Sequence, residues 1–187
     1  MLATVEGIDG LSIGRLAAHV GMSKSGLYAH FRSKQELQLA TIDTAREIFS
    51  REVTRPALAA PPGLTRMLAL CEEFLSHLER RVFPGGCFFV STAIELEAKE
   101  GPVADYLREV AVEFVSLLSA EASQAQQLGQ LRQDLDVTQL AFELDAFLIA
   151  ANLAFVFFAD EASLDRARTA IADSVERARP ERDAETG

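Results

Sequence analysis

The chain has 187 residues, of which 49% are hydrophobic and 25% charged, a composition that excludes a disordered or collagen-like protein. Its two cysteines, Cys71 and Cys87, are too few for a disulfide-rich secreted fold and lack the paired spacing of a zinc site. The longest charge-free apolar run, 146–159, is shorter than the roughly 20 residues that cross a bilayer, so we expect a cytoplasmic protein without membrane association.

Residues 11–31 contain two short predicted helices separated by a glycine turn. Ser12 can cap the first helix, Gly21 permits the sharp turn, and Ser23 can cap the second helix. The first helix would turn four apolar side chains inward: Ile13, Leu16, Ala17 and Val20. Two capped helices around a glycine form a helix-turn-helix, whose second helix enters the major groove of DNA.

The charge distribution agrees with a DNA-binding motif in this part of the chain. The net charge of the whole chain is −10, but segment 11–40 carries +3, so the remaining residues sum to −13. Affinity for DNA comes largely from Lys and Arg side chains that neutralise phosphates. The acidic remainder would repel DNA that approaches from the wrong side.

Six polar residues are candidate DNA contacts: Ser12, Lys24, Ser25, Tyr28, His30 and Lys34. Ser12 would offer its hydroxyl and the free amides of a helix N-terminus to a phosphate. Lys24 begins the second helix and can reach phosphates or base edges, with Tyr28 on the same face. His30 is either a further DNA contact or a solvated surface histidine.

The next two predicted helices follow directly. Ser33 and Glu36 form a capping box, in which both side chains accept bonds from backbone N–H groups, and predict a helix over 34–54. The proline-rich stretch 55–63 should interrupt it. A helix over 64–80 would then carry one apolar stripe.

Three further helices are expected beyond a second break at 83–86. Pro102 suits the first turn of a long helix, and Gly129 ends that helix as a left-handed cap. Asp136 caps the next helix, which is apolar nearly all round and should therefore be buried on several sides. The last helix covers about 163–179. Strand-like alternation is absent, so the chain should be all-α.

Residues 7–37 resemble the DNA-binding signature of TetR-type repressors. The matching positions are Leu16-Ala17, Gly21, Ser23-Lys24, Leu27-Tyr28, His30-Phe31, Lys34 and Leu37. The resemblance implies an all-helical homodimer that binds a palindromic operator, usually as a repressor released by a ligand, and that dimerises through its last two large helices. Two positions depart from the family: only residues 1–6 stand where a full first helix is usual, and Gly14 replaces an often charged residue.

We therefore predict three segments: a helix-turn-helix DNA-binding domain over 1–50 with a truncated first helix, a larger helical domain for effector binding and dimerisation over 51–180, and a disordered tail over 181–187. The predicted partners are double-stranded DNA, a second copy of the chain and an unidentified small apolar or aromatic effector. No cofactor and no metal are expected.

A ligand pocket is expected in the larger helical part of the chain, with candidate lining residues Cys87, Phe88, Phe114, Phe147 and Asn152. The aromatic residues among them would equally well form ordinary core. Asn152 could orient a ligand or pair across the dimer. Cys87 follows a Pro-Gly-Gly turn, and it is either an inert buried cysteine or a reactive thiol at a helix N-terminus.

Motifs of common enzyme classes are missing from the sequence, which has no nucleophile elbow, no zincin motif and no phosphate-binding glycine loop. We therefore expect no catalytic residue and no enzymatic activity. Two rival functions remain open: a dimeric small-molecule carrier or protein-interaction module that has lost DNA binding, and a thiol-dependent enzyme or redox sensor that uses Cys87.

Overall fold

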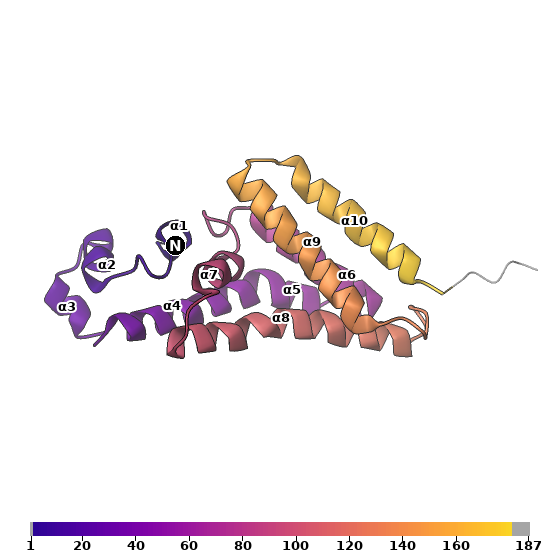
Figure 1. Ribbon diagram of the computed structural model, residues 1–187, viewed down its shortest axis with the longest axis horizontal. Coiled ribbons are helices and arrows are strands. Elements are labelled where there is room, and N and C mark those ends of the chain that lie inside the picture. The colour runs from indigo at the N-terminus through magenta and orange to yellow at the C-terminus, as the bar shows by residue number, and fades with distance from the viewer. Residues whose placement is uncertain (1, 181–187) are drawn as a thin grey trace, which may run out of the picture. The chain divides into compact units, whose positions relative to one another are not determined.

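The computed structural model describes residues 2–180, and within that range it contains helices and turns but no strand (Figure 1). The predicted all-α fold is confirmed. The chain forms two compact units: the first comprises Met1–Arg51 and Arg80–Val112, and the second comprises Glu52–Glu79 and Glu113–Gly187. The domain boundary at residue 50 stays a prediction, and the predicted disordered tail, 181–187, lies outside the described residues.

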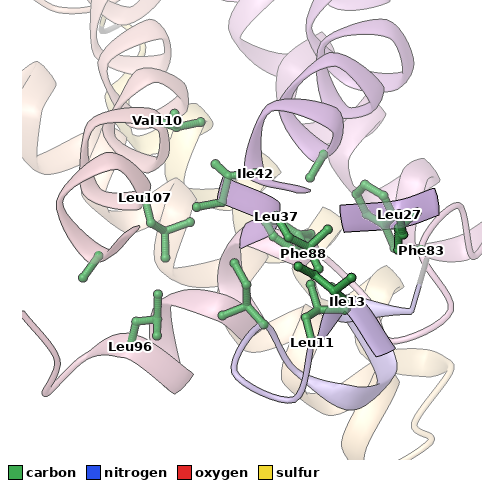
Figure 2. Close-up of a cluster of buried hydrophobic side chains, with 14 of the residues drawn as sticks. Leu11, Ile13, Leu27, Leu37, Ile42, Phe83, Phe88, Leu96, Leu107 and Val110 are labelled. Atoms are coloured by element: carbon green, nitrogen blue, oxygen red, sulfur yellow. The ribbon is translucent and has the colours of Figure 1, made fainter. Parts of the chain in front are cut away.

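The first unit holds the N-terminal helices and a later segment of the chain. Its helices are α1 (Ala3–Glu6), α2 (Ile13–Val20), α3 (Lys24–Tyr28), α4 (Lys34–Phe49), α7 (Phe88–Leu96) and the first part of α8 (Pro102–Gln127). Figure 2 shows side chains from 11–42 meeting side chains from 83–110 in one buried cluster. Segments distant in sequence therefore share the core of this unit.

A few buried side chains anchor the helix-turn-helix in the core of the first unit. Ile13 of α2 and Leu27 of α3 are 5% and 4% exposed, and both lie in the cluster that includes Leu37 and Phe88 (Figure 2). Val20, which we expected to point inward, is 49% exposed because it ends α2 beyond the reach of this cluster.

The predicted helix 34–54 is longer and less regular than its sequence suggested. After α4, residues Ser50–Thr54 form a π-helical segment, and α5 (Arg55–Leu58) continues the helical path through Pro56. Proline lacks the N–H that a helix interior needs, but it is tolerated in the first turn, where Pro56 lies. The wider π turn accommodates this change, so the break begins at residue 59.

The second unit is built around a hairpin of two long helices. α9 (Val137–Phe157) packs against α10 (Ala162–Ala178) and against α6 (Leu64–Glu79), and Figure 1 shows α9 and α10 side by side. Asp136 Oδ1 accepts from the N–H groups of Thr138 and Gln139 at 2.9 and 3.0 Å, which confirms the predicted cap of α9.

Two side chains from the α8 region bind backbone at the start of α6. Glu121 accepts from the N–H of Gly63 at 2.8 Å and pairs with Arg66 at 3.2 Å, while Gln130 accepts from the N–H of Leu64 at 2.9 Å. Helix N-termini leave such N–H groups unpaired and favour a negative charge. The Pro-Pro-Gly stretch before α6 offers no side-chain cap, and these distant residues replace it.

The prediction that α9 is buried on several sides is wrong for the single chain. One face, including Leu144, Leu148 and Phe155, is buried against the neighbouring helices. The opposite face remains in solvent: Phe142 is 64% exposed, Ile149 40%, Leu153 47% and Phe157 75%. The continuous apolar pattern therefore reflects more than the core of one chain.

Candidate nucleic-acid interface

The helix-turn-helix in the first unit has the predicted capping and turn geometry. Ser12 Oγ accepts from the N–H of Arg15 at 3.2 Å, and Ser23 Oγ accepts from the N–H of Gly26 at 3.0 Å. Gly21 adopts φ 69° and ψ 23°, a left-handed conformation that favours glycine. These local interactions determine where α2 ends and where α3 begins.

The helix that follows begins with a variant of the predicted capping box. Ser33 Oγ accepts from the N–H of Glu36 at 3.1 Å, as expected. The Glu36 carboxylate accepts from the N–H of Arg32 at 2.7 Å, one residue earlier than in the usual box. Both side chains thus hold the turn that joins α3 to α4.

One face of α3 is exposed and carries the candidate recognition residues. Lys24, Ser25 and Tyr28 are exposed, with Tyr28 at 55%, whereas Leu27 anchors the helix from behind. The hydroxyls of Ser23 and Ser25 lie 3.2 Å apart. The exposed face combines a cation, a hydroxyl and an aromatic ring, groups that can contact phosphate, sugar or base edges.

Lys24 lies against the first turn of α2. A Cβ added at Gly14 would lie 3.0 Å from Cε and 3.5 Å from Nζ of Lys24. The absence of a side chain at Gly14 therefore makes room for the lysine. This contact places the Lys24 ammonium on the same side as the N-terminus of α2, which Ser12 caps.

The remaining candidate contacts lie beyond α3. His30 is exposed in the turn before α4, and Lys34 is exposed in the first turn of α4. Lys34 Nζ donates to the backbone carbonyl of Asp9 at 2.6 Å, so the lysine also supports the loop before α2. An ammonium has three N–H donors, which leaves donors for a phosphate. The assignment of all six residues to DNA stays a prediction.

The loop between α1 and α2 is held by side chains that no sequence pattern identified. Glu95 of α7 accepts through Oε2 from the N–H of Ile8 and through Oε1 from the N–H of Asp9, both at 2.8 Å. We call this pair of bonds the Glu95 clasp. Lys99 pairs with the Asp9 carboxylate, and Gln38 Nε2 donates to the carbonyl of Ile8 at 3.1 Å.

The candidate pocket residues fall into separate parts of the chain. Cys87 and Phe88 belong to the first unit and are each 1% exposed. Phe114, Phe147 and Asn152 belong to the second unit. There the Phe114 ring lies 5.7 Å from the Phe74 ring, and Asn152 is 4% exposed. The pocket therefore stays a prediction.

Both cysteines are buried, and neither forms a disulfide. Cys71 is 2% exposed, and burial together with the nearby carboxylates of Asp145 and Glu72 raises the pKa of its thiol to about 12. Cys87 is the N-cap residue of α7 and is also buried. A thiol reagent therefore reaches neither sulfur in the folded chain without local opening.

Two protein-family models match the chain. One, described as "Tetracyclin repressor-like, C-terminal domain", matches residues 63–171, and the other, described as "Bacterial regulatory proteins, tetR family", matches residues 1–41. The chain belongs to the TetR family. TetR-family proteins are non-enzymatic DNA-binding transcriptional regulators, so the predicted family and the expected lack of enzymatic activity are confirmed.

Solved structures of TetR-family regulators have the same fold. A regulator from Chloroflexus aurantiacus is 26% identical with a TM-score of 0.86, covering 95% of this chain and 89% of that chain. SCO4454 from Streptomyces coelicolor is 20% identical with a TM-score of 0.80, covering 96% and 90%. The structure of AibR in complex with isovaleryl coenzyme A and operator DNA is 22% identical with a TM-score of 0.66, covering 96% and 92%.

Curated relatives include nucleoid occlusion factors named SlmA from two strains of Haemophilus influenzae. Each is 25% identical over 158 residues, which cover 82% of this chain and 65% of the relative. The chain thus spans 65% of the length of these relatives.

Proposed function

We propose that this TetR-family regulator is a homodimeric repressor that binds a palindromic operator and is released by a small apolar or aromatic effector. The observation that carries the DNA-binding part is the exposed face of α3, presented by a capped helix-turn-helix in segment 11–40, which is basic although the whole chain is acidic. In this mode α3 enters the major groove, with Lys24, Ser25 and Tyr28 at the duplex.

The exposed face of α9 supports a homodimer. Phe142, Ile149, Leu153 and Phe157 are seven, four and four residues apart, so they share one side of the helix. An apolar patch of this kind on a soluble chain marks an interaction surface. A second copy that brings the same face would bury it symmetrically.

A membrane is the other environment that could cover an apolar helix. α9 is long and apolar enough to span a bilayer, and 39% of its most apolar window is buried inside the chain. A core helix of a soluble protein passes the same test. Because membership of the TetR family calls for access to DNA, we assign the chain to the cytoplasm and the face to a second copy.

Effector binding is proposed from the aromatic content of the helical body and from the family fold. AibR was solved with isovaleryl coenzyme A and operator DNA together, so this fold can hold a small molecule and a duplex. By linkage, an effector that weakens operator binding must itself bind less tightly to the operator complex. The effector would therefore favour a dimer whose α3 helices no longer match major grooves roughly 34 Å apart.

Selection of bound sequences from random duplexes tests the DNA-binding proposal. We expect an inverted repeat whose half-sites are centred about one helical turn apart. His30→Ala should weaken binding to the selected sequence, while His19→Ala, which removes an exposed histidine at the C-terminal end of α2, should not. Failure to enrich any sequence would contradict a repressor function.

Titration of candidate effectors into the operator complex tests ligand control. We expect at least one apolar or aromatic compound to raise the dissociation constant of the operator. The same compound should bind the free protein more tightly than the complex, by the same factor. Unchanged operator affinity across a broad panel would contradict release by a small molecule.

The match to SlmA favours a second candidate, a DNA-bound factor that acts in nucleoid occlusion. Mapping the bound sites on the chromosome separates the two functions. A repressor should occupy a few promoters, whereas an occlusion factor should occupy sites spread over the nucleoid. A chain that binds a small molecule but no duplex would instead indicate the dimeric carrier.

A further inference from the structure

The backbone around the Glu95 clasp provides both the space and the N–H donors that a carboxylate needs. Gly7 adopts φ 78°, and a Cβ at this position would lie 2.7 Å from Glu95 Oε1 and 2.9 Å from Oε2. Ile8 is completely buried. The loop therefore presents two consecutive N–H groups to the carboxylate, at a position where a side chain on residue 7 would displace it.

The clasp lies directly before the DNA-binding motif. Asp9 is three residues before Ser12, the cap of α2, so a shift of the loop carries the start of α2 with it. α3 has five residues, of which Leu27 is the buried one. The motif thus has few anchors of its own, and its placement depends on the loop and on the shared core.

We infer that Glu95 is a positioning residue for DNA binding, through which α7 holds α2 and α3 in the arrangement that fits a duplex. The inference rests on the proposed function. Lys99 and Gln38 support the same loop through Asp9 and Ile8. α7 therefore controls DNA affinity without contacting DNA.

The direction of the effect separates positioning from simple electrostatics. A carboxylate repels phosphates, so its removal from a DNA-binding domain should strengthen binding if charge alone mattered. Loss of the clasp should instead weaken binding, because fewer molecules hold the motif in the competent arrangement. If a tenth of the molecules remain competent, the apparent affinity falls about tenfold.

The test uses the full-length protein and the operator selected with it. Glu95→Gln keeps the size of the side chain but points an amide at one of the two N–H groups, and we expect about tenfold weaker operator binding. Glu97→Gln removes the same charge from an exposed residue at the end of α7, and its affinity should equal or exceed that of the wild type. Both variants are measured at a temperature where circular dichroism shows them fully folded.

A structural readout accompanies the affinity measurement. In the wild type and in Glu97→Gln, the amides of Ile8 and Asp9 should be protected from hydrogen exchange, and Glu95→Gln should lose this protection while the amides of α9 keep theirs. The ratio of operator to random-duplex affinity should fall in Glu95→Gln. A general loss of stability would lower the protection of α9 as well, which would contradict a positioning role.

A double-mutant cycle identifies the carboxylate as the group that Gly7 accommodates. Gly7→Ala strains the backbone in any background, but only beside Glu95 does its Cβ also displace the clasp. The Gly7→Ala substitution should therefore lower operator affinity less in the Glu95→Ala background than in the wild-type background. If Gly7→Ala changed operator affinity equally in both backgrounds, or if Glu95→Gln bound the operator as tightly as the wild type, the positioning role of Glu95 would be overturned. The proposed DNA-binding function would still stand. A wild type that binds no duplex would overturn the proposed function and the inference with it.

Discussion

The ammonium group of Lys24 lies beside the first turn of α2, in space that Gly14 leaves open. At the sequence level this lysine was a candidate for phosphates or for base edges. Its contact with α2 favours phosphates, because the N-terminus of a helix attracts the same anion through its free N–H groups. Lys24 should therefore contribute affinity rather than sequence preference.

Lys24→Ala is expected to weaken binding to the operator and to random duplexes by similar factors. The proposed dimer loses two phosphate contacts, one per subunit, so the slope of log K against log salt should become shallower by about 1.8, at about 0.9 for each contact. Binding isotherms at several salt concentrations measure both quantities. Arg179→Ala removes an exposed cation from the end of α10 and should leave the slope unchanged. A loss confined to the operator would assign Lys24 to base edges instead.

Asp145 carries a carboxyl group whose pKa is raised by burial within the second unit. A raised pKa in the folded state means that stability is fully present below the ordinary value of 3.8 and is lost as the pH rises through the folded pKa. At neutral pH the buried charge therefore lowers the free energy of unfolding.

Asp145→Asn should unfold at a higher temperature than the wild type at pH 7, and the difference should shrink as the pH approaches about 4. Thermal unfolding across this pH range measures the effect. Asp173→Asn, at an exposed position of α10, should follow the wild type throughout. A less stable Asp145→Asn at pH 7 would show that the carboxylate is stabilised in the folded state.

The sequence predicted individual residues well where the interaction is local. Ser12, Ser23 and Asp136 accept bonds from N–H groups two or three residues away, so short patterns identify them. Glu95 and Glu121 also bind backbone N–H groups, but their partners lie 87 and 58 residues away. Only the folded chain brings such groups together, which explains why the clasp had no sequence signal.

At the scale of whole elements, α6 and α10 are joined by one arginine. Arg168 donates to Glu72 at 2.9 Å and to Glu79 at 3.2 Å, both on α6, and to Asp165 on its own helix at 3.0 Å. Its guanidinium holds all three carboxylates at once because its donors point in fixed directions. The arginine side chain is 29% exposed, whereas the Glu72, Glu79 and Asp165 side chains are 54%, 59% and 84% exposed, so water screens the carboxylate side of the network.

Arg168→Lys should lower the free energy of unfolding by about 1 kcal/mol, because one ammonium cannot keep the three-way geometry. Urea unfolding measures the change. Arg166→Lys alters an arginine on the same helix that is 70% exposed and pairs with Asp160, and it should change stability far less. Equal effects of the two substitutions would show that the network adds nothing to a single surface pair.

Most helix ends could be predicted because caps, prolines and glycines act within one turn. Pro102 and Gly129 bracket α8 as expected, and the helix over 64–80 ends one residue early as α6. The π-helical segment at Ser50–Thr54 was missed. It lets the helix continue through Pro56, whereas the pattern of prolines alone predicted an end.

For the whole molecule, the apolar character of α9 indicated burial but not the partner. One side of the helix packs inside the chain and the other is exposed. Apolar residues mark every face of a helix that is buried, and the sequence does not distinguish burial within one chain from burial between two copies. The exposed side therefore explains why a prediction based on one chain expected too much burial.

Leu153→Glu should convert the proposed dimer into a monomer, because each subunit would have to bury an unpaired carboxylate in the interface. Operator affinity should fall by at least about a hundredfold once the two half-sites are no longer bound by linked subunits. Light scattering coupled to size-exclusion chromatography measures the mass. Leu128→Glu changes an exposed leucine beyond the end of α8 and should remain dimeric. A dimeric Leu153→Glu would place the subunit contact elsewhere.

Because both native cysteines are buried, the wild-type chain can be labelled selectively at a cysteine introduced on its surface. A His19→Cys substitution, at an exposed position outside the candidate DNA contacts, would supply the sole thiol open to a maleimide dye, since Cys71 and Cys87 are buried. Fluorescence from that dye would report when the helix-turn-helix binds and leaves DNA, without any further engineering of the protein.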